Sequence, residues 1–260
     1  MTVAEPKGLD PRARQRFIMD LLVRDGATHV DNLAHLLRVS AMTIYRDVAE
    51  LERSQLVVRH RGEVRAASSS LTEAAARVRI STNEQTKAKL AAKVRTFLAR
   101  GQSVLVDDSS SNLALLDDLE EFAPITIITN AEFIATKVRH REGVRLILVG
   151  GEYEAWADSY FGHCAETVIN QLKADLCVMS ATALTPTYCY HPNQDVARVK
   201  RAMIANSTKK ILVVDSSKFR RSALHKVGPV TDFDIVITDE NTPAAIATAI
   251  EEQGVTVIKV

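Results

Sequence analysis

A series of short apolar segments, separated by amphipathic ones, restricts the fold of this 260-residue chain more than any other feature. The apolar segments are 103–107 (SVLVD), 125–129 (ITIIT), 145–149 (RLILV), 176–180 (LCVMS), 211–215 (ILVVD), 235–238 (IVIT) and 255–260 (VTVIKV). Helical patterns lie between them, for example at 86–100, 131–139, 160–173 and 195–207. Continuous apolar strands that alternate with helices are typical of a mainly parallel sheet covered on both faces. We therefore predict an α/β fold for this region.

Residues 1–66 have a different pattern, in which short helices precede two short strands. Asp10 and Pro11 suit the N-cap and the first position of a helix. A further helix is expected from residue 41 to about 54, and the segment 56–65 has the pattern of two strands around a turn. This order predicts a winged helix-turn-helix.

The predicted helix that starts at residue 41 has one apolar side and one accessible side. Ile44, Val48 and Leu51 cluster on one side, at about 100° per residue, and can seat the helix on its neighbours. The other side can enter the major groove, which is about 12 Å wide, with Arg46 donating to a guanine or a phosphate. We predict that the DNA contacts are Ser40, Met42, Thr43, Tyr45 and Arg46, together with Arg59 and Arg61 of the basic wing.

Composition excludes several classes of protein. With 33 Lys+Arg against 32 Asp+Glu, no global field marks a partner. The cysteines, 3 in number, form no CxxC pair, so neither a disulfide framework nor a zinc site is expected, and no cofactor is predicted. No segment reaches the roughly 18 apolar residues of a membrane span, and the start resembles no signal peptide. A cytoplasmic protein without membrane association is therefore expected.

The stretch 39–65, VSAMTIYRDVAELERSQLVVRHRGEVR, resembles the signature of the DeoR family of bacterial transcription regulators. The positions that match are Val39, Ser40, Thr43, Ile44, Arg46, Asp47, Leu51, Glu52, Arg59, His60 and Gly62. Tyr45 replaces the first arginine of the usual pair, Ser54-Gln55 stands where a glycine is common, and RGE (61–63) stands where the paired glycines sit. The resemblance implies an operator DNA as partner.

Polar residues follow several predicted strands at the ends where parallel sheets bind ligands. The first strand runs into DDSSSN (107–112) and then an expected helix, which gathers N–H groups and hydroxyls into a ready anion site. Asp107 and Asp108 would repel a phosphate, but they accept hydrogen bonds from sugar hydroxyls, so a phosphorylated sugar would use both features. The alternatives are an ordinary polar loop and, for Lys200, a solvated surface lysine.

These loops resemble, in order, the family's sensor domain, whose pattern is DSGTT, TN, GG, VKR and DxSKF. The resemblance implies a fold similar to ribose-5-phosphate isomerase and an effector that is a phosphorylated sugar. It implies effector contacts at Asp107, Ser109, Ser110, Ser111, Thr129, Asn130, Gly150, Gly151, Lys200 and Lys218. Ser109 replaces the loop glycine, and SATALTPTYCYHPNQD (180–195) departs from the family's glycine-containing run.

Two functions compete for this architecture, a transcription regulator and a sugar-phosphate isomerase with an accessory DNA-binding module. Isomerisation needs a positioned carboxylate base, but no Asp or Glu lies between Asp175 and Asp195, where isomerases of this fold carry an acidic pair. Motifs of other enzymes, such as GxGxxG, GxxxxGK[ST] and HExxH, are absent. We therefore predict a regulator and not an enzyme.

The predicted protein is a repressor of sugar-metabolism or sugar-uptake genes, whose affinity for DNA a phosphorylated sugar modulates. The expected domains are 1–66 for DNA binding, 67–85 as linker, and 86–260 for effector sensing and oligomerisation. Because a single helix-turn-helix reads only a half-site, a homodimer or homotetramer is expected.

Overall fold

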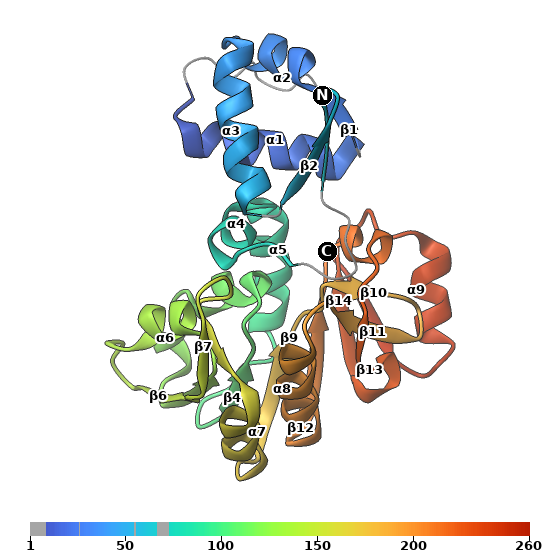
Figure 1. Cartoon of the computed structure of the whole chain (residues 1–260). Coiled ribbons are helices and arrows are strands. Elements are labelled where there is room, and N and C mark those ends of the chain that lie inside the picture. Colours follow the sequence, from blue (N-terminus) through green and yellow to red (C-terminus); the bar gives the residue numbers. More distant parts are fainter. Residues whose placement is uncertain (1–8, 26, 55, 67–72) are drawn as a thin grey trace. The chain divides into compact units, whose positions relative to one another are not determined.

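The computed structural model describes residues 9–25, 27–54, 56–66 and 73–260 (Figure 1). The chain divides into two compact units, Met1–Asn83 and Glu84–Val260. Part of the predicted linker, 67–72, lies outside the described residues, whereas its later part forms helix α4 (Ala76–Ser81). Because Ala74 and Val78 pack against the core of the N-terminal unit, this helix belongs to that unit. The predicted domain limits stay a prediction.

The N-terminal unit is a winged helix-turn-helix. Its helices are α1 (Pro11–Asp25), α2 (Val30–Leu37) and α3 (Ala41–Arg53), and its strands are β1 (Ala27–His29), β2 (Val57–His60) and β3 (Glu63–Ala66). The strands form an antiparallel sheet in the order β1-β3-β2. Ile44, Val48 and Leu51 of α3 are buried against α1 and α2, which confirms the predicted apolar side.

The turn of the wing depends on two residues with positive φ. Arg61 has φ of 50° and Gly62 has φ of 83°, as a tight turn between antiparallel strands requires. Glycine suits this position because of its positive φ, and a Cβ there would also lie 2.6 Å from Cε1 of His29, whose side chain would have to move. Arg61 accepts the left-handed conformation, which costs roughly 1–2 kcal/mol for a residue with a side chain.

A buried ion pair fixes α3 to α1. Arg14 donates from Nε to Oδ2 of Asp47 at 2.7 Å and from its second terminal nitrogen to Oδ1 at 3.2 Å. The hydrogen bond to Asp47 raises the pKa of Arg14 above its ordinary value, against the opposing effect of burial. The two planar groups meet side on, which sets the orientation of α3 as well as its position.

Replacement of Asp47 by alanine should destabilise the N-terminal unit. The change leaves the Arg14 guanidinium buried without its carboxylate, because the two side chains are only 12% and 5% exposed. We expect a loss of about 3–5 kcal/mol in the free energy of unfolding, measured by chemical denaturation. As a control, Glu50→Ala breaks an exposed pair with Arg53 on the same helix and should cost at most about 1 kcal/mol. Equal losses in the two variants would contradict this account.

A parallel sheet forms the centre of the C-terminal unit. Its strands are β4 (Ser103–Val106), β5 (Ile125–Thr129), β6 (Val144–Leu148), β9 (Ala174–Met179), β12 (Ser207–Val213), β14 (Ile235–Thr238) and β15 (Thr256–Lys259). They are ordered β15-β14-β12-β9-β4-β5-β6, and every neighbouring pair is parallel. Each predicted apolar segment is one of these strands, so the predicted α/β class is confirmed.

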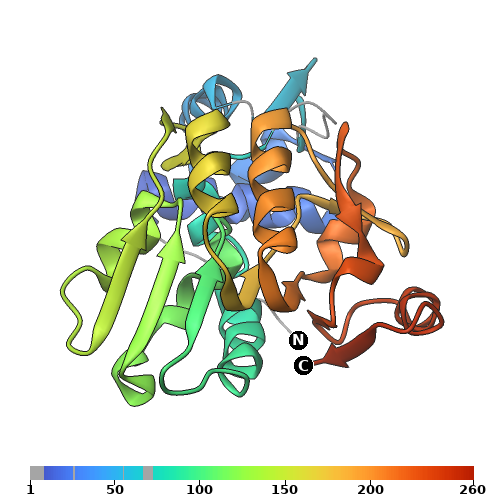
Figure 2. The ribbon, with the colours of Figure 1, turned by 90° about the horizontal axis from the view of Figure 1, so that it is seen from below.

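Helices cover both faces of this sheet. They are α5 (Glu84–Arg95), α6 (Glu132–Val138), α7 (Gly162–Asn170), α8 (Gln194–Ala205) and α9 (Ala244–Glu251). Figure 2 shows α7 and α8 side by side over one face. Successive residues of β4 enter different cores, since Leu105 packs with residues of α7 and α8 whereas Val104 and Val106 pack with residues of α5 and α6. Burial on both faces explains why the strands are apolar without alternation.

Several short elements were not predicted. A hairpin joins β7 (Glu152–Glu154) to β8 (Ser159–Phe161), and β10 (Ala183–Leu184), β11 (Tyr188–His191) and β13 (His225–Pro229) form a small antiparallel sheet. The 3-10 helices are η1 (Ser110–Leu116), η2 (Leu119–Phe122), η3 (Ser216–Arg220) and η4 (Val230–Asp232). The expected helix after the serine-rich loop is therefore η1, a 3-10 helix. Within the described ranges, no helix has the length and apolarity that crossing a membrane requires.

Candidate DNA-binding surface and effector site

The outer side of α3 is accessible in the N-terminal unit. Met42 is 63% exposed, and Arg46 lies one turn further along, also exposed. Ser40 caps the helix by accepting a hydrogen bond from the N–H of Thr43 at 3.2 Å, and the two hydroxyls lie 2.9 Å apart. The cap therefore holds these two side chains together at the end of the helix that is predicted to meet DNA.

Tyr45 and Arg59, both predicted DNA contacts, are engaged with each other. The Arg59 guanidinium lies over the Tyr45 ring, 5.0 Å from its centroid. Glu52 completes the cluster, since its carboxylate accepts from the Arg59 backbone N–H at 3.1 Å and lies 3.5 Å from Arg59 Nε. Tyr45, which replaces an arginine of the family pattern, thus ties α3 to the wing strand β2. The role of Glu52 could not be predicted from helical spacing, because its partner Arg59 lies beyond the end of α3.

Arg46 and Arg61 are the predicted cations that stand clear of carboxylates. Both are exposed, and in the part of the chain that the structure describes neither guanidinium has an ion-pair partner. Arg46 projects from the recognition helix and Arg61 from the tip of the wing. Such a pair suits a base contact in the groove and a phosphate contact beside it.

Arg46→Ala should weaken binding to the operator. If Arg46 reads a base, the loss is about 1–3 kcal/mol in binding free energy, and selectivity against unrelated DNA falls with it. Fluorescence anisotropy at fixed salt concentration measures both quantities. Arg53→Ala is the matched control, because Arg53 is exposed on the same helix but pairs with Glu50. Unchanged affinity and selectivity in Arg46→Ala would remove this residue from the DNA contact surface.

The predicted effector residues lie at the carboxyl edge of the C-terminal sheet. From β4 the chain proceeds to β5 and β6 on one side, and β9 and β12 lie on the other, so the strand order reverses between β4 and β9. Asp107 follows β4 and Ser180 follows β9. Open parallel sheets bind ligands at such a switch point.

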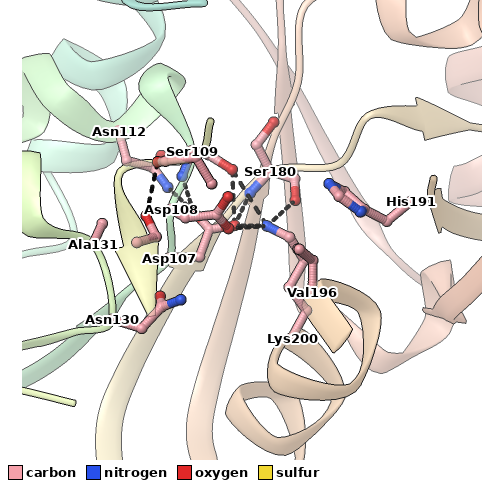
Figure 3. A network of polar contacts seen from close by, with 12 residues as sticks. Asp107, Asp108, Ser109, Asn112, Asn130, Ala131, Ser180, His191, Val196 and Lys200 are labelled. Atoms are coloured by element: carbon pink, nitrogen blue, oxygen red, sulfur yellow. Dashed lines mark hydrogen bonds and ion pairs between the residues drawn. The ribbon is translucent and has the colours of Figure 1, made fainter. Parts of the chain in front are cut away.

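Asp107 is the centre of a buried polar network there (Figure 3). Its Oδ1 accepts from the Ser109 N–H at 3.1 Å and from Asn112 Nδ2 at 2.8 Å. Its Oδ2 accepts from the Ser109 hydroxyl at 2.9 Å, from the Ser180 N–H at 3.0 Å and from the Lys200 ammonium. The carboxylate therefore shapes the segment 107–112, which we call the serine loop, and connects it to β9 and α8.

Lys200 is buried and not a surface group. Its ammonium pairs with Asp107 and, at 3.2 Å, with Asp108, and it lies 3.3 Å from the Ser180 carbonyl oxygen. Burial alone would lower the pKa of Lys200, but the two carboxylates outweigh it and raise the pKa above its ordinary value. The alternative of a solvated lysine is wrong. The acidic charge that was expected to repel a phosphate is partly neutralised by this cation.

A second buried lysine, which sequence reasoning missed, reaches the serine loop from α5. Lys87 Nζ donates to the Ser110 hydroxyl at 2.9 Å, and the lysine is 8% exposed. Ser109, Ser110 and Ser111 are themselves buried. Lys87 lies on the same face of α5 as the buried Leu90, Ala91 and Val94, at the spacing i, i+3, i+4 and i+7, so helical periodicity could have identified it as an inward-facing cation.

Thr129 and Asn130 lie at the end of β5, next to the serine loop. The Thr129 hydroxyl accepts from the N–H of Ala131 at 3.1 Å, and Asn130 Nδ2 donates to the Tyr160 carbonyl oxygen at 2.8 Å. Asn130 Oδ1 is buried and has no hydrogen-bond partner among the described residues. A buried acceptor without a donor is costly, so a donor such as a ligand hydroxyl would stabilise it.

The remaining predicted residues lie at other strand ends. Gly151 has φ of 152°, and a Cβ there would collide with the Phe161 carbonyl oxygen, whereas Gly150 is exposed with open space around it. Lys218 is half-buried on η3 and helps to lower the pKa of Asp215, which burial would raise. The structure thus brings Asp107, Ser109 and Lys200 into one network that does not include the two glycines and Lys218.

His191 and Trp156 also border this network and were not predicted. Figure 3 shows the His191 ring pointing toward Ser180. Its Nδ1 accepts from the Asn193 N–H at 3.0 Å, and its ring stacks on Trp156 with centroids 6.4 Å apart. Trp156 stacks on Phe161 in turn. Within the described residues no cluster of three or more His, Cys, Asp and Glu side chains is placed to hold a metal ion.

Replacement of Lys200 by methionine should destabilise the C-terminal unit by about 3–5 kcal/mol, because it leaves two buried carboxylates without their cation. The pKa of Lys200 is raised, so the contribution of its ion pairs to the free energy of unfolding is complete at neutral pH. This contribution is lost only as the pH rises above about 10.5, the ordinary lysine value, and through the raised pKa. Thermal unfolding between pH 7 and 11 measures this. Arg201→Met, exposed on the same helix, removes one hydrogen bond to the Lys226 carbonyl oxygen and should cost at most about 1.5 kcal/mol; an equal cost would contradict the assignment.

The fold and the two sites define a DNA-binding regulator with a separate ligand-sensing unit, and sequence comparison assigns its family. The DeoR-like helix-turn-helix domain matches residues 14–82, and the DeoR C terminal sensor domain matches residues 82–240. The chain belongs to the DeoR family. It is accordingly a regulator of transcription and not an enzyme, and its partner is operator DNA.

Relatives of known name match nearly the whole chain. The Glycerol-3-phosphate regulon repressor of Escherichia coli is 29% identical over 90% of this chain and 92% of its own length. The Transcriptional repressor AccR of Agrobacterium fabrum is 28% identical over 92% of this chain and 93% of its own. The HTH-type transcriptional repressor CsqR of Escherichia coli is 27% identical over 99% of this chain and 98% of its own.

Solved structures give weaker matches. Ribose 5-phosphate isomerase A of Methanocaldococcus jannaschii has a TM-score of 0.39 and 14% identity, over 53% of this chain and 55% of that one. The chain thus spans little more than half of the isomerase's length. Translation initiation factor eIF-2B of Pyrococcus horikoshii has a TM-score of 0.43 and 11% identity, over 88% of this chain and 82% of that one.

Proposed function

We propose that this protein is a cytoplasmic repressor of sugar-metabolism or sugar-uptake genes and that a phosphorylated sugar modulates its affinity for the operator. The observation that carries the proposal is the serine loop at the switch point of the sheet, whose buried hydroxyls lie beside the buried ammonium group of Lys200. Hydroxyls and cations suit the phosphate of such an effector. The relative that represses a glycerol-3-phosphate regulon supports an effector of this chemical class.

The proposed effector contacts are the residues implied by the family pattern, with the exception of the Asp107 carboxylate. Asn130 supplies a buried acceptor for a sugar hydroxyl, and Lys218 supplies a half-buried cation for the phosphate. Asp107 has a structural role, because its carboxylate already accepts hydrogen bonds from five donors and fixes the conformation of the serine loop. Contacts to the ligand then come from the neighbouring serines.

The proposed DNA contacts are those of α3 and the wing. Because one recognition helix reads only a half-site, we propose a homodimer or homotetramer that reads two half-sites about one helical turn apart. Effector binding shifts the population of DNA-competent arrangements by the difference in its affinity for the two forms.

A gel-shift titration on the DNA upstream of the protein's own gene tests this function. The panel contains glycerol 3-phosphate, ribose 5-phosphate, fructose 6-phosphate and glucose 6-phosphate, each beside its unphosphorylated counterpart. One phosphorylated compound should change the apparent Kd for the operator about 5–150-fold, the usual range of allosteric coupling. An equal response to the unphosphorylated counterpart, or no response to any compound, would contradict the proposal.

Lys218→Gln should weaken effector binding about 10–100-fold, because one charge-assisted hydrogen bond is worth roughly 1.5–3 kcal/mol. Calorimetric titration of the protein with the active compound gives the Kd. Arg220→Gln removes an exposed cation from the same 3-10 helix and should leave the Kd within about twofold of the unmodified protein. If the two variants bind alike, the phosphate site does not include Lys218.

A further inference from the structure

Lys87 stands where the two units of the chain join. It lies in the first turn of α5, which is the first helix of the C-terminal unit. The residues between α4, the last helix of the N-terminal unit, and α5 are Thr82 and Asn83. The covalent path from this lysine to the DNA-binding unit is therefore short.

Helix α5 packs on η1, whose first three residues, 110–112, are the last part of the serine loop. Leu90 and Val94 of α5 share a core with Leu115 and Leu116 of η1. Beyond this apolar contact, Lys87 makes a buried polar one, since its Nζ donates to the Ser110 hydroxyl at 2.9 Å. Helix α5 thus contacts the serine loop through the Lys87 ammonium, a charged group that an anion bound nearby would attract.

The far part of η1 is held by α6. Lys137 of α6 donates to the Leu113 carbonyl oxygen at 3.0 Å and pairs with Asp117 at 2.6 Å. The other end of the serine loop is held by the Asp107 network. Between these two anchors lies Ser110, and the bond from Lys87 acts at this point.

We propose that Lys87 is the positioning residue through which occupancy of the serine loop changes the DNA-binding unit. This inference rests on the proposed function. An anionic group bound at the serine hydroxyls attracts the Lys87 ammonium and changes its hydrogen bond with Ser110. The first turn of α5 moves with that change. Thr82 and Asn83 connect this turn to α4, the last helix of the DNA-binding unit. Lys87 bonded to Ser110 and Lys87 drawn toward the bound anion are two arrangements. They favour different populations of DNA-competent forms.

The test compares operator affinity with and without a saturating effector in the full-length protein. The effector is the phosphorylated sugar of the panel that raises the melting temperature of the unmodified protein most. In Lys87→Met, saturating effector should change the operator Kd by less than about twofold, against about 5–150-fold in the unmodified protein. The effector must still raise the melting temperature of this variant. Lys87→Arg keeps a cation at this place and should restore at least part of the response.

Lys89→Met is the matched control, because Lys89 is exposed on the same helix and has no hydrogen bond or ion pair among the described residues. It should keep the full response. A full response in Lys87→Met overturns the inference, and so does complete loss of effector binding, which would make Lys87 a ligand contact. If Lys87→Met fails to fold, Lys87→Gln, which is polar but uncharged, carries the same expectation. A panel that never raises the melting temperature of the unmodified protein overturns the proposed function itself, so the two failures are distinguishable.

Discussion

The arrangement of the C-terminal site depends above all on the buried carboxylate of Asp107. Its donors come from the serine loop, from the end of β9 and from α8, which are distant in sequence. A buried carboxylate is tolerated only when its lone pairs are satisfied and its charge is paired. The same requirement that stabilises the group therefore fixes the backbone at the switch point of the sheet. The site is in this sense organised before any ligand arrives.

The N-terminal unit uses charge in a comparable way, but for orientation. Arg14 and Asp47 hold α3 at a set angle on α1, while Tyr45, Arg59 and Glu52 hold the wing against the same helix. Residues that match the family signature thus serve two purposes. Asp47 and Glu52 maintain the geometry of the motif, and Arg46 stays exposed for the proposed contact with DNA.

Sequence reasoning succeeded where a local pattern determines the structure. The strands of the large sheet are apolar throughout because both faces are buried, and the inward side of α3 follows from helical periodicity. It failed for the short strands β1, β7, β8 and β10, which are too brief to show a period. The burial of Lys200 was also missed, since its partner Asp107 lies 93 residues away and no local pattern marks such a pair. For Lys87, helical periodicity places the residue on the buried face of α5, but its partner Ser110 lies 23 residues away and could not be predicted.

The stack of Trp156 on His191 has a practical consequence. The sequence contains 1 tryptophan, so the intrinsic indole emission of the whole protein originates beside the Asp107 network. The imidazole that touches this indole points toward Ser180 at the edge of the sheet. The emission spectrum of Trp156 can therefore report on events near the switch point of the sheet without a dye or an added label.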